Sequence, residues 1–125
     1  MIQKETFLRV VDNSGVKFVK CLQVAKSSNS SDGKIGDILV VSVKSMQKKR
    51  NISKIKRGDI FYAILIRTKN KIIKMDSQWL HFFENAVILT NKNLKPVANR
   101  IIGPVLKLLR STKTIKLISM SSGFL

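Results

Sequence analysis

A chain of 125 residues, 44% of them hydrophobic, is long enough for one domain with a modest core and is too apolar for a disordered basic tail. Its 24 Lys and Arg residues against seven acids give a formal net charge of +17, which favours a polyanionic partner. Nucleic acid is the first candidate and an anionic membrane surface the second. No apolar run approaches the roughly 20 residues that span a bilayer, so we expect no membrane partner.

The first two-thirds of the chain shows short strand patterns separated by turn signals, as in a small β barrel or sandwich. Strands are expected over residues 6–11, 16–26, 37–46, 60–68, 79–83 and 86–90. The second strand changes the parity of its apolar residues between Cys21 and Leu22, which predicts a bulge or a strong bend. The third and fourth strands are almost continuously apolar. We expect one face of each to line the barrel and the other to be covered by loops or the C-terminal segment.

The last third of the chain predicts helical turns that cap the barrel. Pro104 stands at a favourable first helical position, and Val105, Leu108 and Leu109 would share one helix face. A second short apolar segment, TIKLISM, follows. The chain contains no internal repeat and no linker that would divide it.

The residue types that build catalytic or metal sites are scarce. Cys21 is the only cysteine and His81 the only histidine, so a zinc site built from Cys and His ligands cannot be assembled. We expect Cys21 to be a buried free thiol. Five acids lie at turns, which leaves only Glu5 and Glu84 without a turn role. We therefore expect no enzymatic activity, no metal and no cofactor.

The basic residues gather in stretches that contain no acid. Residues 38–58 and 85–125 each carry seven bases and no acid. Because these bases fall mainly in loops and at strand ends, we expect them to project from an apolar scaffold toward phosphate groups. The alternative is that the lysine-rich surface is merely solvated. That interpretation suits a protein with balanced charges better than one with a net charge of +17.

The aromatic residues bear on how RNA would be contacted. A single-strand binder displays aromatic side chains on one sheet face, where bases stack on them. Phe61, Tyr62 and Trp79 could serve in this way, but core packing is the favoured interpretation. We therefore expect contact with RNA shape and phosphates rather than base-by-base readout. If bases did stack on these rings, the protein would instead be a free single-strand RNA-binding protein or chaperone of the OB or cold-shock type, and this function is kept as the alternative.

Four segments occur in the order and spacing of one family: MIQKETFLRVVDNSG, KRGDIFYAILIRTK, HFFENAVIL and NRIIGPVLKLLR. From Met1 to about Met120 the chain resembles the universal large-subunit ribosomal protein L-fourteen family. The resemblance implies a mainly β fold, a five-stranded barrel over about residues 1–100 with short C-terminal helices over about 101–125, as one domain. It also implies a structural protein that binds large-subunit rRNA at the subunit interface. Its further implied partners are small-subunit rRNA across intersubunit bridges, neighbouring large-subunit proteins and the ribosome-silencing factor.

The candidate RNA-binding residues come from the charge pattern and from the resemblance. Matching positions in the family motifs imply Lys44, Arg67, Lys69 and Arg100. The full predicted set is Lys44, Lys48, Lys49, Arg50, Lys54, Lys56, Arg57, Arg67, Lys69, Arg100, Lys107 and Arg110.

Four positions depart from the family pattern and affect expected protein contacts more than RNA binding. Ser77 replaces a glycine, Phe83 a common aspartate, Asn99 a threonine and Ile102 an aromatic residue. The C-terminus, SMSSGFL, also lacks the usual Pro-Glu ending. Because the resemblance places the silencing factor and partner proteins on the interface side, these differences bear on those contacts and not on the RNA role.

The composition also bears on origin. Lys outnumbers Arg 18 to 6, with 15 Ile and eight Asn, as expected of an AT-rich genome. The N-terminus has neither a signal-peptide nor a transit-peptide pattern, and the family start aligns with Met1. We expect a ribosome in the mitochondrial matrix, with the bacterial cytoplasm or a plastid as alternatives.

Overall fold

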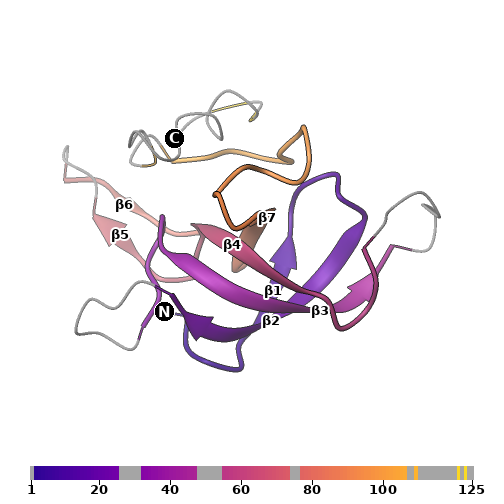
Figure 1. Ribbon diagram of the computed structural model, residues 1–125. Helices are drawn as coiled ribbons and strands as arrows, with labels where there is room; N and C mark the ends of the chain where they lie inside the picture. The colour runs from indigo at the N-terminus through magenta and orange to yellow at the C-terminus, as the bar shows by residue number, and fades with distance from the viewer. Residues whose placement is uncertain are drawn as a thin grey trace.

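The computed structural model describes residues 2–25, 32–47, 55–73, 77–106, 109, 121 and 123. A closed barrel contains, in hydrogen-bonded order, β1 (Phe7–Val10), β2 (Val16–Val24), β3 (Ile38–Met46), β4 (Ile60–Arg67) and β7 (Ala86–Thr90) (Figure 1). A parallel pairing of β1 with β7 closes the barrel, and its other four pairings are antiparallel. The predicted mainly β fold with a five-stranded barrel is confirmed.

An inner apolar cluster fills the barrel. Successive side chains of a strand point to opposite faces, so residues of one parity meet inside. The buried members of this cluster are Ile2, Leu8, Val10, Val16, Val19, Cys21, Leu39, Val41, Val43, Ala63, Leu65, Val87 and Leu89. Full burial of one such Val or Leu side chain contributes about 1.5–3 kcal/mol to stability. Cys21 is a buried free thiol, as predicted, and burial raises its pKa.

An outer apolar cluster lies on the outside of the barrel, over β4 and β7. It comprises Val11, Ile64, Ile66, Ala86, Ile88, Ile101, Val105 and Leu109. The side chains of β4 and β7 that point out of the barrel thus pack against the segment that follows β7. Figure 1 shows this segment in orange on that side of the barrel. This confirms that the C-terminal segment covers the second face of the strand expected over 60–68.

The bulge predicted in the second strand is present. The register between β2 and β3 shifts between Cys21 and Gln23, so one extra β2 residue is accommodated at that point. The shift explains why the apolar parity of the sequence changes there.

One predicted barrel strand and one predicted helix differ in the structure. Residues 79–83 do not join the barrel; β6 (Trp79–Leu80) pairs with β5 (Ile72–Ile73) in a separate two-stranded sheet, because the closed barrel has no free edge. The helix expected from Pro104 does not begin there: residues 104–106 are not helical, and Val105 donates its backbone N–H to the Gly123 carbonyl at 3.1 Å. Leu109 donates to the Leu106 carbonyl at 3.1 Å, a single turn of 3₁₀ type. Residues 107, 108, 110–120, 122, 124 and 125 of the expected helical portion lie outside the described residues.

Two acids close turns in the way the sequence predicted. Asp37 accepts the backbone N–H of Lys34, and Asp59 accepts that of Lys56, each at 2.8 Å. The two carboxylates therefore shape the turns that precede β3 and β4.

Asp12 has a larger role because it is buried. One carboxylate oxygen accepts the Ser14 N–H at 3.0 Å, and the other accepts the Leu89 N–H of β7 at 3.1 Å. The turn between β1 and β2 is thereby fastened to β7. Burial raises the pKa of Asp12, while its hydrogen bonds with Ser14 and Leu89 act in the opposite direction.

Candidate nucleic-acid interface

The twelve predicted RNA-binding residues fall into three groups in the structure. The exposed ones are Lys44, Lys56, Arg57, Lys69 and Arg100. Arg67 is buried. The remaining six lie outside the described residues: Lys48, Lys49, Arg50, Lys54, Lys107 and Arg110.

The end of β3 and the turn before β4 bring three of the exposed cations to one corner of the barrel. Arg57 donates its Nε–H to the Lys44 carbonyl at 3.0 Å. Gly58 makes the turn with a φ of 87°, and Asp59 holds the Lys56 backbone. Backbone contacts therefore fix this corner while the charged ends of Lys44 and Lys56 stay exposed.

Lys69 and Arg100 are held through their backbones by asparagine side chains. The Lys69 N–H donates to Asn85 Oδ1 at 3.0 Å, and the Arg100 N–H donates to Asn13 Oδ1 at 3.3 Å. The two residues extend the exposed positive charge to the connection after β4 and to the segment after β7. Their side chains are exposed.

Arg67 is placed differently from the other predicted residues. Its side chain is 7% exposed, and its guanidinium donates to Glu84 Oε1 at 3.0 Å and to the carbonyls of Ile102 and Pro104. Burial lowers the pKa of Arg67, and the Glu84 carboxylate opposes that effect. Arg67 therefore joins β4 to the C-terminal segment, and its donors are directed into the fold rather than toward solvent.

Gly103 makes the close approach of Arg67 feasible. Its φ is 90°, and a Cβ at this position would collide with the Arg67 guanidinium. The Gly103-Pro104 pair, part of the family segment NRIIGPVLKLLR, thus serves the packing of Arg67.

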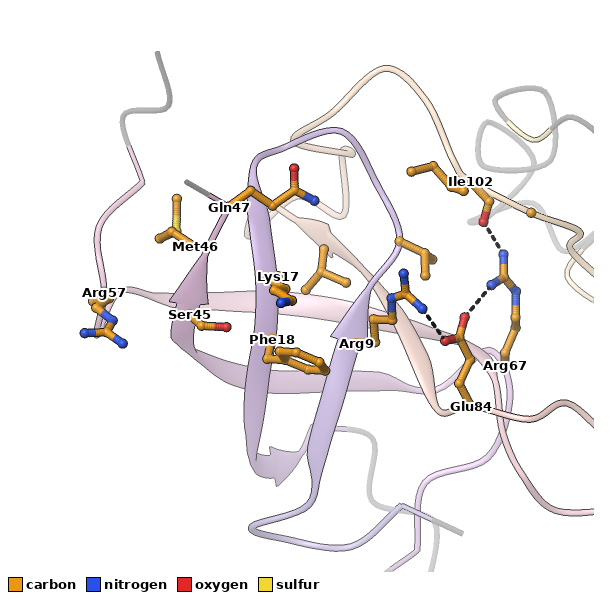
Figure 2. Close-up of a pocket in the computed structure, with 13 residues that line it drawn as sticks. Arg9, Lys17, Phe18, Ser45, Met46, Gln47, Arg57, Arg67, Glu84 and Ile102 are labelled. Atoms are coloured by element: carbon orange, nitrogen blue, oxygen red, sulfur yellow. Dashed lines mark hydrogen bonds and ion pairs between the residues drawn. The ribbon is translucent and has the colours of Figure 1, made fainter. Parts of the chain in front are cut away.

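Glu84 is a functional residue that sequence reasoning left unassigned. Its Oε2 accepts from Arg9 Nη1 at 2.9 Å while its Oε1 accepts from Arg67 (Figure 2). One carboxylate thus faces two guanidinium groups, and the trio keeps one net positive charge. No local pattern reveals the pairing, because Arg9 and Glu84 are 75 residues apart in sequence.

An open groove of about 1160 Å³ extends from Arg57 at one end to Arg67 at the other (Figure 2). Arg9 and Lys17 line it between these ends. Glu84 is the only acid among the described residues that line the groove, and it is already paired with two arginines. The groove is therefore positively charged, which suits a phosphate-bearing ligand.

A second irregularity in β2 shapes this groove. The register between β2 and β3 shifts on both sides of Phe18. In a regular strand Lys17 and Phe18 would point to opposite faces, but here both are exposed and both line the groove. The barrel wall thus presents a cation and an aromatic ring together.

The model of the ribosomal protein L14p/L23e family matches residues 1–125, the full chain. The chain belongs to this family. As an L14p/L23e protein it is a structural constituent of the large ribosomal subunit that binds rRNA, and its place of work is the ribosome. The family is in general not enzymatic.

Several aromatic residues of this L14p/L23e protein lie where the sequence did not predict them. Trp79 was expected in the core and is 65% exposed, while Phe7 and Phe18 are 62% and 38% exposed. The expectation for Trp79 was wrong because Trp79 lies on β6, in the two-stranded sheet outside the barrel. Phe7 and Phe18 lie on β1 and β2 and are not among the described residues of the outer cluster. Phe61 does pack against the inner cluster. Phe83, one of the departures from the family pattern, is 91% exposed.

Among the described residues, no three His, Cys, Asp or Glu side chains gather as a metal site would require. In the same part of the chain, no helix has the length and apolar character that a membrane crossing demands.

Proposed function

We propose that this ribosomal protein contacts large-subunit rRNA through exposed basic side chains around the groove and at the ends of barrel strands. The observation that carries the proposal is the groove itself, where Arg9, Lys17 and Arg57 face solvent beside one already paired acid. Each cation that meets a phosphate releases counterions, so affinity accumulates from many contacts and falls with salt. The barrel acts as the rigid support that holds the cations in place.

The proposed contacts extend over most of the predicted basic residues. The exposed members are supported by the structure and the others by their place in acid-free stretches of sequence. Arg67 is assigned a positioning role instead, because its guanidinium is occupied by Glu84 and two carbonyls. The family match supports residues 1–125 acting as one ribosomal-protein domain.

We further propose that the protein lies at the subunit interface. There it would contribute to bridges with small-subunit rRNA and contact neighbouring large-subunit proteins and a ribosome-silencing factor. The sequence resemblance supports this placement. Crosslinking in intact ribosomes is expected to join the protein to the rRNAs of both subunits. Crosslinks to large-subunit rRNA alone would remove the bridging role.

The lysine-rich, AT-type composition supports a mitochondrial ribosome as the place of work. Fractionation of cells into mitochondria, plastids and cytoplasm tests this directly. Recovery of the protein with cytoplasmic or plastid ribosomes would contradict it.

The RNA contacts can be tested by removing two exposed charges at the barrel corner. Lys44→Gln with Lys56→Gln leaves the Arg57 hydrogen bond intact, because that bond uses the Lys44 backbone. If both lysines touch phosphates, the slope of log affinity against log salt should decrease by about 1.4–1.8 units. Filter binding of large-subunit rRNA fragments over a salt series measures this slope.

A matched control lies at the other end of the barrel. Lys4→Gln with Lys34→Gln removes the same charge near the Ile2–Gly33 bridge, before β1 and β3 begin. The control should change the slope less than the corner variant. Equal slopes for the two variants would show that the corner lysines are merely solvated.

The exposed Phe7, Phe18 and Trp79 favour a second candidate, a free single-strand RNA-binding protein or chaperone. A sucrose gradient at moderately high salt separates the two functions. The ribosomal protein should remain with the large subunit, whereas a free chaperone should be recovered in the light fractions.

A further inference from the structure

We propose that the groove binds an unpaired rRNA nucleotide whose base stacks on Phe18. This inference rests on the proposed RNA-binding function and narrows its ligand. It differs from the expectation drawn from the sequence, in which RNA is contacted by shape and phosphates alone. The ligand class is a nucleotide that has left its helix, with an exposed base face and an accessible phosphate.

Three adjacent strands place complementary groups in one row across the barrel wall. Arg9 of β1 is the Cα partner of Phe18, and Phe18 in turn is the partner of Ser45 on β3. Directly opposed residues have side chains roughly 4.5–5.5 Å apart at Cβ. Figure 2 shows this row along the groove. A guanidinium plane, an aromatic ring and a hydroxyl therefore follow one another, and all three are groups that recognise unstacked bases.

Ser45 carries the second, independent observation. Its Oγ has no hydrogen-bond partner among the described residues, although the atom is buried. A polar group without a partner in such a position is costly, so rotation of the Ser45 side chain toward a ligand in the groove would supply a hydrogen bond that the free protein lacks. The edge of a base stacked on the neighbouring Phe18 would lie beside this hydroxyl.

Lys17 covers the stacking surface in the RNA-free protein. Its Nζ lies 5.7 Å from the centroid of the Phe18 ring, a cation–π contact. At an exposed site such a contact is weaker than base–aromatic stacking, so a base can replace the ammonium group on the ring. The displaced Lys17 side chain then becomes available for the phosphate of the same nucleotide.

The charges of the groove favour the phosphate that accompanies the base. Glu84 is held by Arg9 and Arg67, so it offers no free carboxylate to repel the phosphate. Arg57 at the far end supplies a further cation. A base within a duplex is stacked on its neighbours and cannot reach a ring inside a groove, so the site selects an unpaired nucleotide.

The test uses the full-length protein and two short RNA hairpins with the same stem. One hairpin carries a single bulged 2-aminopurine, whose fluorescence is quenched when it stacks, and the other is fully paired. The wild-type protein should prefer the bulged hairpin and quench its fluorescence. Phe18→Leu keeps an apolar side chain but removes the ring, and it should reduce affinity for the bulged hairpin roughly five- to hundredfold.

Two further variants make the result specific. Phe18→Tyr keeps the ring and should retain both the preference and the quenching. Phe83→Leu removes an aromatic residue that is more exposed than Phe18 but does not line the groove, and it should leave both unchanged. Circular dichroism of each variant checks that the barrel is folded.

The outcomes distinguish the two proposals. If the wild-type protein binds both hairpins equally, or if Phe18→Leu matches it in affinity and quenching, the nucleotide site is overturned while RNA binding stands. If the wild-type protein binds neither these hairpins nor large-subunit rRNA fragments, the proposed RNA contacts themselves fail, and the site fails with them.

Discussion

Among the described residues, Glu84 is the carboxylate on which the ion pairs of Arg9 and Arg67 depend. Its carboxylate is the acidic partner of Arg67, whose side chain is almost fully enclosed. A buried charge that loses its partner keeps the cost of its desolvation without the compensating attraction. Arg67 cannot relieve that cost by giving up its proton, because guanidinium stays charged in proteins. The stability of the connection between β4 and the C-terminal segment should therefore be sensitive to one carboxylate.

We predict that Glu84→Gln lowers the free energy of unfolding by about 1–3 kcal/mol, because it leaves a buried cation beside a neutral amide. Urea unfolding monitored by Trp79 fluorescence or circular dichroism measures the change. Glu5→Gln removes the same charge at an exposed position and should stay within about 0.5 kcal/mol of wild type. Equal stability of the two variants would show that the Glu84 pairs contribute nothing.

Gly103 gives a second prediction at the scale of one residue. Gly103→Ala adds a methyl group that meets the Arg67 guanidinium, in addition to the strain of a φ near 90°. Gly58→Ala introduces comparable φ strain, but nothing lies within 4 Å of the new methyl group. Unfolding experiments should therefore show Gly103→Ala to be the more destabilised variant, by about 1 kcal/mol or more. Equal losses would mean that Arg67 moves aside without cost.

At the scale of elements, buried Asp12 connects the β1–β2 turn to β7. Its pKa in the folded protein is raised above the ordinary value of 3.8 because burial disfavours the charged form. Between 3.8 and the raised pKa, the folded state binds more protons than the unfolded state. The stabilising contribution of this group is therefore fully present below 3.8 and is lost as the pH rises through the folded pKa.

Asp12→Asn removes the titrating carboxyl group. The difference in unfolding free energy between wild type and this variant should therefore change with pH as the Asp12 side chain titrates. The excess stability of wild type over the variant should decrease as the pH rises from below 3.8 to neutrality. Urea unfolding of both proteins over that range provides the measurement. A difference that is constant with pH, or that grows toward neutrality, would contradict the assignment.

At the scale of the whole molecule, the barrel wall carries apolar layers on both sides of β4 and β7. Leu65 belongs to the inner cluster and Ile66 to the outer one, and both are fully buried. Leu65→Ala and Ile66→Ala should each cost about 2–5 kcal/mol in unfolding experiments, because both leave cavities. Ile60→Ala, on an exposed position of the same strand, should cost about 0.5 kcal/mol or less. A small effect of Ile66→Ala would show that the C-terminal segment covers β4 only loosely.

The parts of this architecture that follow from local sequence were predictable. The unbroken apolar run of β4 indicated two covered faces, and turn acids such as Asp37 indicated where strands begin. The parity change beyond Cys21 indicated a bulge. Each of these signals depends on neighbours within a few residues, so no knowledge of the tertiary fold is needed to recognise it.

The parts that depend on distant partners could not be predicted. Arg67 occupies a basic position of a family motif, but its partners Glu84, Ile102 and Pro104 lie 17 to 37 residues away. The exposure of Phe18 depends on register shifts that place two consecutive side chains in one groove, and Phe18 is not among the described residues of the outer cluster. Periodicity alone cannot tell an aromatic residue in the core from one on an uncovered wall.

Because β1 pairs with β7, one edge of the first barrel strand stays unpaired until the last barrel strand has been synthesised. A chain still emerging during its synthesis can form the β1–β2 and β2–β3 hairpins early, but it cannot close the barrel before Ala86–Thr90 is available. Until then β1 and β4 each keep one edge unpaired, and such edges promote association between chains. Premature termination before β7 should therefore yield insoluble or rapidly degraded fragments rather than a smaller folded protein. The groove is complete later still, because only a chain that extends through Gly103 contains all the residues that line it.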